Sequence, residues 1–426
     1  MIQRAFILST GDELTTGKVV DTNANYIADQ LNQIGLDLAG VITVGDVPDR
    51  LELAWKTAME LADVVISTGG IGPTADDLTT ETVARLTGKK LWFDDASADK
   101  MRRVFASGGR KMPENNLKQA MFPETAVILP NALGTAPGFR MAVEQKNHTA
   151  HLIVLPGVPR EMKPMMEEIV IPWLVESRGH DKVHVSQTFQ TYGISESGLD
   201  QAVAGLIKPS EARVSFRASF PQISLRVAVE GHPGEAQTRL DELSARVREK
   251  ISDFVYAEGD VTMEDVVGRL LTERHLTLAV AESCTGGLIG HRITNVAGAS
   301  NYLLADLVTY SNESKIKQLG VSEETLKQHG AVSDQCVLEM AAGVRKVTGA
   351  DIGLATSGIA GPGGGTPEKP VGTVCIALVA DGFKTSRSYR MWGNRDWIKT
   401  LASQVALDWI RRYLLGLPMG EGLFRR

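Results

Sequence analysis

Short apolar runs rich in β-branched residues alternate with helical patterns in two separate stretches of the chain. From residue 1 to about 170 the order is RAFILST, NANYIADQLNQIG, LAGVITVGD, DRLELAWKTAMELA and DVVISTGG. The alternation returns from about 257 to 415, between MEDVVGRLLTERH and the closing DWIKTLASQVALDWIRRYLLG. Such alternation predicts α/β domains, each a parallel sheet with helices on both faces. Ligands are then expected at the carboxyl ends of the strands.

The segment between these two stretches has a different order of elements. Residues 171–256 read as β, α, β, β, α, β, which is typical of a small α+β domain of the split βαβ kind. This segment has no evident catalytic cluster, so we expect it to act as a spacer or docking domain. The predicted domains are 1–170, 171–256 and 257–415, and a flexible tail is expected at 416–426.

Composition excludes several classes of protein. Among the 426 residues, Lys and Arg number 45 against 51 Asp and Glu, a net charge of −6, so no general basic surface for nucleic acid is expected. No run of eighteen apolar residues is present, and the N-terminal apolar run is too short for a secretion signal. The three cysteines show no metal-ligand spacing. We expect a cytoplasmic protein with no membrane partner.

A glycine-rich loop follows the apolar run DVVIST. The stretch TGGIGPTADDLTTETVARLTG contains Gly69, Gly70 and Thr74, then Asp76 and Asp77, before a helix that Thr79 or Thr80 could cap. Glycines leave backbone N–H groups free, and a helix N-terminus favours an anion, so a phosphate-bearing ligand fits this loop. Two adjacent carboxylates would repel that anion unless a divalent cation such as Mg²⁺ lay between them. Alternatively, one aspartate caps the turn and the other is solvated.

A second acidic loop, GDELTTGKVVDTNANYIADQL, follows the first strand and contains Asp12 and Asn23. Loops after neighbouring strands can share one rim of a doubly wound sheet, so both loops are expected to face one cleft. Asn23 could instead be a helix N-cap. Lys118 and Arg160 are candidate phosphate ligands, or simply solvated cations.

The stretches STGGIGPTADDLT and GDELTTGKVVDTN together resemble the molybdopterin-binding-like domain at the N-terminus of the CinA family (competence/damage-inducible protein A). The resemblance covers roughly residues 1–170. In several members this domain is associated with ADP-ribose pyrophosphatase activity. The resemblance therefore implies a nucleotide site in this domain.

Near residue 280 the stretch LTLAVAESCTGGLIG places Glu282, Ser283, Cys284 and Thr285 at the end of a buried strand. A hydroxyl at such a strand-to-helix corner can act as a nucleophile beside N–H groups that stabilise an oxyanion. Cys284 is a second candidate, because a thiol at a helix N-terminus can have a lowered pKa. Side chains alternate along a strand, so only one of Ser283 and Cys284 can face the cleft, and the sequence does not say which.

A serine nucleophile needs a base. His291 is expected inside the next helix and His329 at a helix C-terminus, and neither resembles a catalytic histidine with an orienting acid. Lys315, in LVTYSNESKIK, is the alternative, because a lysine kept neutral by burial can serve as the base of a Ser/Lys pair.

Two further stretches carry phosphate-binding chemistry. The glycine- and proline-rich SGIAGPGGGTPEKPVGTV (357–374) can wrap a phosphate and ribose with backbone donors, or can be only a long hairpin connection. WGNRDWIK (392–399) places Arg395 at the start of the last helix as a guanidinium fork for a phosphate or carboxylate.

The stretches AESCTGG, VTYSNESK, HGAVS, SGIAGPGGGTPEKPVGTV and GNRD follow one another in the order typical of the CinA C-terminal domain, whose relatives are nicotinamide mononucleotide (NMN) deamidases. The resemblance covers about 260–415. It implies that Ser283 attacks the nicotinamide amide and that Lys315 relays protons, without a cofactor. Substrate contacts are implied at Thr285, Gly286, Tyr310, Gly358, Gly361 and Arg395. Family members commonly carry Arg at the position of Lys399, so phosphate affinity is expected to be weaker here.

Together these features predict a cytoplasmic enzyme with two activities: NMN amidohydrolase at the C-terminus, and a metal-dependent ADP-ribose pyrophosphatase at the N-terminus. The expected partners are NMN, ADP-ribose and a second copy of the chain in a homodimer. The alternative is a nucleotide-binding regulatory or scaffold protein of the competence or DNA-damage response that turns over no substrate.

Overall fold

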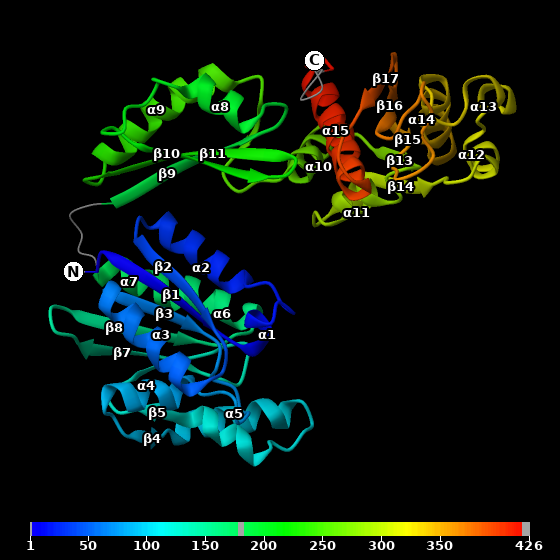
Figure 1. Ribbon diagram of the computed structural model, residues 1–426. Helices are drawn as coiled ribbons and strands as arrows, with labels where there is room; N and C mark the ends of the chain where they lie inside the picture. The colour runs from blue at the N-terminus through cyan, green and yellow to red at the C-terminus, as the bar shows by residue number, and fades with distance from the viewer. Residues whose placement is uncertain (1, 178–182, 420–426) are drawn as a thin grey trace. The chain divides into compact units, whose positions relative to one another are not determined.

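The computed structural model describes residues 2–177 and 183–419, which form two compact units (Figure 1). The first unit contains residues 1–185 together with 229–238, and the second contains 186–228 together with 239–426. Most of the predicted flexible tail, residues 420–426, lies outside the described residues.

The first unit contains a six-stranded sheet in the order β2-β1-β3-β8-β7-β6. Strands β2, β1, β3 and β8 are parallel, whereas β7 pairs antiparallel with β8 and β6 pairs antiparallel with β7. The predicted α/β class is confirmed, although the sheet is mixed rather than wholly parallel. The strands are β1 (Arg4–Thr10), β2 (Asp37–Val44), β3 (Val64–Thr68), β6 (Val127–Leu129), β7 (Gly138–Glu144) and β8 (Thr149–Leu155); a separate pair is formed by β4 (Leu91–Phe93) and β5 (Met121–Pro123).

Helices cover both faces of this sheet because successive side chains of each buried strand point to opposite sides. On one face Ile7 and Ile66 pack against α2 and α6; on the other, Leu8 and Val65 pack against α3 and α4. The helices are α1 (Asp12–Thr15), α2 (Thr22–Gln33), α3 (Pro48–Leu61), α4 (Thr79–Thr87), α5 (Asp95–Ser107), α6 (Pro159–Met165) and α7 (Ile171–Ser177), with a 3₁₀ helix η1 (Glu114–Ala120) and a π-helix η2 (Met166–Val170).

The middle segment folds in the predicted order β, α, β, β, α, β. Its sheet runs β10-β11-β9-β12, which is the strand order of a split βαβ domain. The turn between β10 and β11 carries Phe220. Its ring stacks on the ring of Trp397, in the first turn of the last helix, with 4.3 Å between the two ring centroids. The elements are β9 (Val183–Thr191), α8 (Glu196–Val203), β10 (Arg213–Ser219), β11 (Gln222–Gly231), α9 (Glu235–Ile251) and β12 (Val255–Glu258).

The C-terminal sheet has five strands in the order β14-β13-β15-β16-β17. Strands β14, β13 and β15 are parallel, and β16 and β17 form an antiparallel hairpin beside β15. This hairpin also departs from the wholly parallel sheet that the alternation predicted. The strands are β13 (Leu278–Glu282), β14 (Leu303–Val308), β15 (Ile352–Gly358), β16 (Thr373–Ala380) and β17 (Phe383–Arg390).

Two apolar cores flank this sheet. Leu278 and Val280 of β13 face α10, α11 and α15, whereas Ala279 and Ala281 face α12 and α14. None of the described helices is long and apolar enough to cross a membrane. The helices are α10 (Met263–Arg274), α11 (Leu288–Thr294), α12 (Asn312–Leu319), α13 (Glu323–His329), α14 (Asp334–Thr348) and α15 (Arg395–Leu415), with one turn η3 (Ala299–Asn301).

Candidate functional site

The corner after β13 depends on two glycines. Gly286 (φ 62°) and Gly287 (φ 89°) both adopt the left-handed region, which side chains with a Cβ rarely enter. They turn the chain from the end of β13, which lies between β14 and β15, directly into α11. The residues before them are thereby held at the carboxyl end of the sheet, where α/β domains bind ligands.

Ser283 and Cys284 point to opposite faces of the sheet, as strand alternation predicts. Cys284 lies in the apolar core with α10, α11 and α15, and burial raises the pKa of its thiol to about 12. A thiol with that pKa is almost wholly protonated at neutral pH and is a poor nucleophile. Ser283 is therefore the side chain of the two that meets Lys315.

Lys315 reaches Ser283 from the second turn of α12. Ser311 caps that helix by accepting a hydrogen bond from the Ser314 amide. The Lys315 side chain is only 1% exposed, and its Nζ lies 3.2 Å from Ser283 Oγ. Burial lowers the pKa of Lys315 from its usual value.

Two backbone carbonyls complete the surroundings of the Lys315 nitrogen. Nζ donates to the carbonyl of Thr309 at 2.8 Å and to that of Tyr310 at 3.3 Å. A neutral primary amine has two N–H donors and one lone pair. In the charged form the three N–H groups donate to these carbonyls and to Ser283 Oγ; in the neutral form the carbonyls take both donors, and the lone pair can accept a proton from Ser283.

Glu282, the residue before Ser283, stabilises the corner through hydrogen bonds from main-chain amides. Its carboxylate is fully buried and accepts hydrogen bonds from the amides of Gly287 (2.9 Å), Ile289 (2.8 Å) and Gly290 (2.9 Å). These amides form the N-terminus of α11, which has no other side-chain cap. The role of Glu282 was not predicted from the sequence, although an acid at the end of a buried strand is a visible signal.

The Thr285 hydroxyl is turned into the protein. It is fully buried and lies 2.8 Å from the hydroxyl of Thr356 on β15. A contact with substrate at this position would therefore involve the Thr285 backbone.

Arg395, the first residue of α15, contacts two of the other predicted site residues. Its guanidinium donates to the Tyr310 hydroxyl at 2.9 Å and to the Gly361 carbonyl at 2.6 Å. The loop containing Gly361 connects the antiparallel strands β15 and β16. Gly358 lies in β15, where a Cβ would come within 2.8 Å of the Thr373 carbonyl.

Lys399 lies one turn beyond Arg395 on α15. Its Nζ would be 3.9 Å from a Cβ placed on Gly286. Two cations at positions i and i+4 lie on the same side of a helix. Arg395 and Lys399 thus border the glycine corner with adjacent positive charges.

In the first unit, the loop after β3 is built around close backbone contacts. Gly69 (φ 99°) and Gly70 (φ 67°) leave no room for a side chain, because added Cβ atoms would lie 2.4 Å from the Thr10 carbonyl and 2.1 Å from Thr79 Oγ1. Leu78, not Thr79 or Thr80, occupies the N-cap position of α4. Thr79 instead donates its hydroxyl hydrogen bond to the Gly69 carbonyl.

Asn23 is not the helix cap that one interpretation expected; Asp21 caps α2 by accepting from the Ala24 amide. The Asn23 side chain donates to Thr68 Oγ1 at 2.9 Å and to the Gly157 carbonyl at 2.7 Å. Its Oδ1 is buried without a hydrogen-bond partner. Through these hydrogen bonds, Asn23 connects the segments at the carboxyl ends of β1, β3 and β8.

The two predicted aspartates of the glycine loop differ in their contacts. Asp77 accepts from the Thr74 amide (2.8 Å) and hydroxyl (2.5 Å), so it closes the turn, whereas Asp76 is exposed. Lys118 donates to the carbonyls of Thr74 and Asp77 and pairs with Glu81. Lys118 thus supports the loop. Arg160 is exposed on α6.

Asp46, a further acidic residue near this loop, was not predicted from the sequence as a site residue. Its carboxylate accepts from the Asp12 amide at 3.0 Å, and the Asp12 carboxylate accepts from the Asp46 amide at 3.1 Å. Burial raises the pKa of Asp46, and the negative charges of Asp12, Glu13 and Asp76 add to the rise. Within the described ranges, no group of three or more His, Cys, Asp or Glu side chains forms a preassembled metal site.

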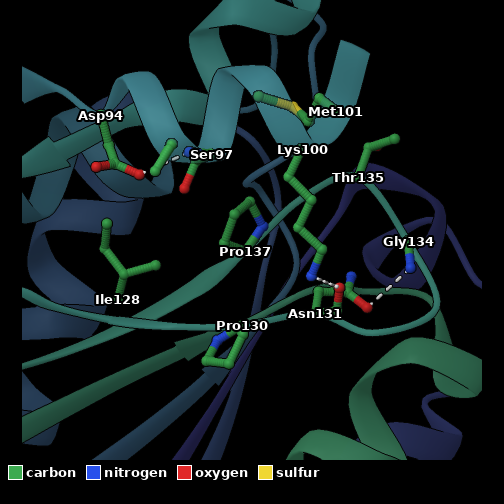
Figure 2. Close-up of a pocket in the computed structure, with 11 residues that line it drawn as sticks. Asp94, Ser97, Lys100, Met101, Ile128, Pro130, Asn131, Gly134, Thr135 and Pro137 are labelled. Carbon is green, nitrogen blue, oxygen red and sulfur yellow. Dashed lines mark hydrogen bonds between the residues drawn. The ribbon is translucent and has the colours of Figure 1, made fainter. Parts of the chain in front are cut away.

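A cavity of about 380 Å³ lies apart from the glycine loop, between α5 and the loop 130–137 (Figure 2). Lys100 extends across it and donates to the Asn131 carbonyl at 2.8 Å. The Asn131 side chain accepts from the Leu133 and Gly134 amides, which shapes the loop. The stretch NALGTAPG is rich in Gly and Pro, a composition that indicates a turn or loop. This loop was not predicted as part of a site.

Three family models match the chain. The CinA C-terminal domain matches residues 260–414, the probable molybdopterin binding domain 6–176, and the damage-inducible protein CinA KH domain 186–257. A CinA-like protein of Syntrophotalea carbinolica is 42% identical over 408 residues, covering 96% of this chain and 98% of the relative. A putative competence-damage inducible protein of Clostridium perfringens is 39% identical, covering 96% and 99%. A crystal structure of the competence damage-inducible protein A of Klebsiella pneumoniae is 36% identical, covering 36% of this chain and 95% of that one, with a TM-score of 0.35.

Proposed function

The chain belongs to the CinA family, and from that membership we propose that its C-terminal domain hydrolyses the carboxamide of NMN to nicotinate mononucleotide and ammonia. The observation that supports this most is the contact between the buried Lys315 amine and the Ser283 hydroxyl. No cofactor is required, because the serine and lysine supply nucleophile and base.

In the first half of the reaction, Ser283 Oγ attacks the amide carbon while its proton passes to Lys315 Nζ. The tetrahedral intermediate then breaks its C–N bond, and the Lys315 ammonium donates the proton to the departing nitrogen. Ammonia leaves, and the nicotinoyl group remains as an ester on Ser283. Positioned proton transfer of this kind contributes roughly 10²- to 10⁴-fold to a rate.

In the second half, Lys315 takes a proton from a water molecule that attacks the ester carbon. The ester C–O bond breaks, and Lys315 returns the proton to Ser283 Oγ. Nicotinate mononucleotide is released, and the enzyme is restored. The lysine thus alternates between base and acid, as a group with a lowered pKa can do near neutral pH.

The oxyanion of each tetrahedral intermediate needs hydrogen-bond donors. The amides of Gly286 and Gly287 are already used, the first by the Ser283 carbonyl and the second by Glu282. We assign the oxyanion role to the amides of Cys284 and Thr285.

The phosphate of NMN would be held by Arg395 and Lys399 at the start of α15. Arg395 is oriented by Tyr310 and Gly361, and a guanidinium fixed in this way is suited to bind a phosphate with two hydrogen bonds. Tyr310, which is 59% exposed, would then border the substrate.

For the N-terminal domain we propose binding and metal-dependent cleavage of a nucleotide diphosphate such as ADP-ribose. The glycine loop, the unpartnered Asn23 Oδ1 and the acids Asp12, Asp46 and Asp76 support this. Mg²⁺ is commonly held by one or two carboxylates plus substrate phosphates, which these residues fit better than a cage of protein ligands. Asp76 with Asp12 or Asp46 would hold the ion, which would neutralise phosphate charge when bound.

The experiment that tests the proposal incubates the full chain with NMN and measures ammonia together with nicotinate mononucleotide. Equal amounts of both products are expected from the wild type and none from Ser283→Ala. A parallel incubation with ADP-ribose and Mg²⁺ tests the first unit. Tight binding of both nucleotides with no product from either would instead support the regulatory protein without turnover.

A further inference from the structure

Three aromatic rings meet where the turn between β10 and β11 reaches the start of α15. The ring of Phe220 is stacked on that of Trp397, with 4.3 Å between the centroids and 27° between the planes. Trp392 meets both rings at steep angles, at 5.9 Å from Phe220 and 5.2 Å from Trp397. Aromatic pairs at such distances attract each other beyond the effect of buried area. The rings therefore join the middle segment to the first turn of α15.

Trp397 holds the turn that precedes α15 in two ways. Gly393 has a φ of 102°, and a Cβ added to it would lie 2.9 Å from the Trp397 Cβ, so the Trp397 side chain packs directly on this turn. The Trp397 amide also donates a hydrogen bond of 2.9 Å to Asn394, the N-cap of the helix. Helix ends fray unless such contacts hold them. Phe220, by stacking on Trp397, adds a contact from the middle segment to this helix end.

The next residue after the N-cap is Arg395, which the proposed function places at the substrate phosphate together with Lys399. Its guanidinium donates to the Tyr310 hydroxyl and to the Gly361 carbonyl, so its direction depends on where the helix begins. Side chains two positions apart do not face the same side of a helix. Trp397 and Arg395 thus point in different directions, and Phe220 can affect Arg395 only through the backbone of the first turn.

We propose that Phe220 is a positioning residue for substrate phosphate: through Trp397, the middle segment fixes the first turn of α15 so that Arg395 and Lys399 bind the phosphate together. The middle segment then sets substrate affinity in addition to acting as a spacer. This inference rests on the proposed amidase function. Because Ser283 and Lys315 lie on other elements, the proposal concerns binding and not the chemical step.

The test measures KM and kcat of Phe220→Ala in the full chain, with NMN and with nicotinamide riboside, which lacks the phosphate. KM for NMN should rise about 3- to 10-fold, the factor that an aromatic pair contributes to an equilibrium constant. We expect kcat for NMN and KM for the riboside to stay within twofold of the wild type. Phe220→Tyr, which keeps the ring, should restore the KM for NMN.

Two controls separate positioning from a general loss of structure. Phe93→Ala removes a ring of similar exposure from β4 in the first unit and should change none of these values. Phe220→Leu keeps an apolar side chain without a ring and should show the same rise in KM if Phe220→Ala folds poorly, as judged by its melting temperature. In the background Arg395→Ala/Lys399→Ala, adding Phe220→Ala should raise KM no further, since residues that act through one another are not additive.

An unchanged KM for NMN in both Phe220→Ala and Phe220→Leu would overturn the inference and leave the amidase function intact. So would an equal rise in KM for NMN and for the riboside, because the ring would then serve another part of the substrate. Calorimetry of NMN binding separates the two proposals. If the wild type binds NMN without turnover, the amidase function fails, and the same 3- to 10-fold ratio is expected between the dissociation constants of Phe220→Ala and the wild type. If NMN neither reacts nor binds, both are refuted.

Discussion

The amine of Lys315 lies 3.2 Å from the hydroxyl of Ser283, although the two residues are 32 positions apart in the sequence. Ser283 follows strand β13, whereas Lys315 lies in helix α12. Three features create this contact: the glycine corner after β13, the Ser311 cap that starts α12, and the carbonyls of Thr309 and Tyr310. The contact therefore depends on the fold of two neighbouring strand ends.

Removing the Lys315 amine should abolish catalysis without unfolding the protein. Lys315→Met should lower kcat for NMN by at least about 100-fold, and Lys315→Arg should be as inactive, because a guanidinium stays protonated. The melting temperature of Lys315→Met should equal or exceed that of the wild type, since an apolar side chain replaces a buried polar group. Lys317→Met, on the exposed side of the same helix, is the control and should keep full activity.

The pH dependence should report the lowered pKa of Lys315. Because the base must be neutral, kcat/KM should rise with pH to a plateau, and the midpoint of the rise should lie below the usual lysine pKa of about 10.4. Between the folded and unfolded pKa values, the unfolded chain binds the extra proton, so the Lys315 contribution to stability rises with pH. Thermal melts of wild type and Lys315→Met should differ in slope over that range. Identical slopes would show that the lysine is charged in the folded protein.

Phosphate recognition should depend on the two cations at the start of α15. Arg395→Ala should raise KM for NMN about 10- to 100-fold, as expected for the loss of a charged hydrogen bond. Lys399→Arg, which replaces a compact ammonium by a guanidinium that can form two parallel hydrogen bonds, should lower KM. Nicotinamide riboside, which lacks the phosphate, is the control substrate. An equal loss of activity toward the riboside would place Arg395 elsewhere in the mechanism.

In the first unit, the adjacent aspartates should have separable effects. Asp77→Asn should lower the melting temperature, because Asp77 accepts two hydrogen bonds that close the loop. Asp76→Asn should leave the melting temperature unchanged and weaken Mg²⁺-dependent binding of ADP-ribose, measured by calorimetry with and without EDTA. If Asp76→Asn binds ADP-ribose and Mg²⁺ as the wild type does, the cation is not held by this loop.

Much of this arrangement follows from the sequence, since alternating patterns predict buried parallel strands and the position of the loops at their ends. RAFILST and DVVIST became adjacent strands, so Asp12 and Gly69 lie on one rim. The sequence also predicted that Ser283 and Cys284 would face opposite sides, but not which would meet Lys315. That choice depends on which face α12 covers, a tertiary fact that no local pattern records.

Contacts made through the backbone could not be predicted from the sequence. Main-chain carbonyls surround Lys315 Nζ, and main-chain amides donate hydrogen bonds to Glu282. Every residue type has these groups, so the sequence does not mark which residues supply them. Asp46 was missed because its pairing with Asp12 runs through main-chain N–H groups. Thr285 was expected at the substrate because of its motif, yet its hydroxyl bonds Thr356, which is distant in sequence.

The most direct test of the account adds hydroxylamine to the reaction with NMN and measures hydroxamate formation by mass spectrometry. An ester on Ser283 would be intercepted by hydroxylamine, so the wild type and Cys284→Ala should both form the mononucleotide hydroxamate, and Ser283→Ala should form none. Hydroxamate and ammonia that persist in Ser283→Ala, or that vanish in Cys284→Ala, would contradict the proposal that Ser283 is the nucleophile.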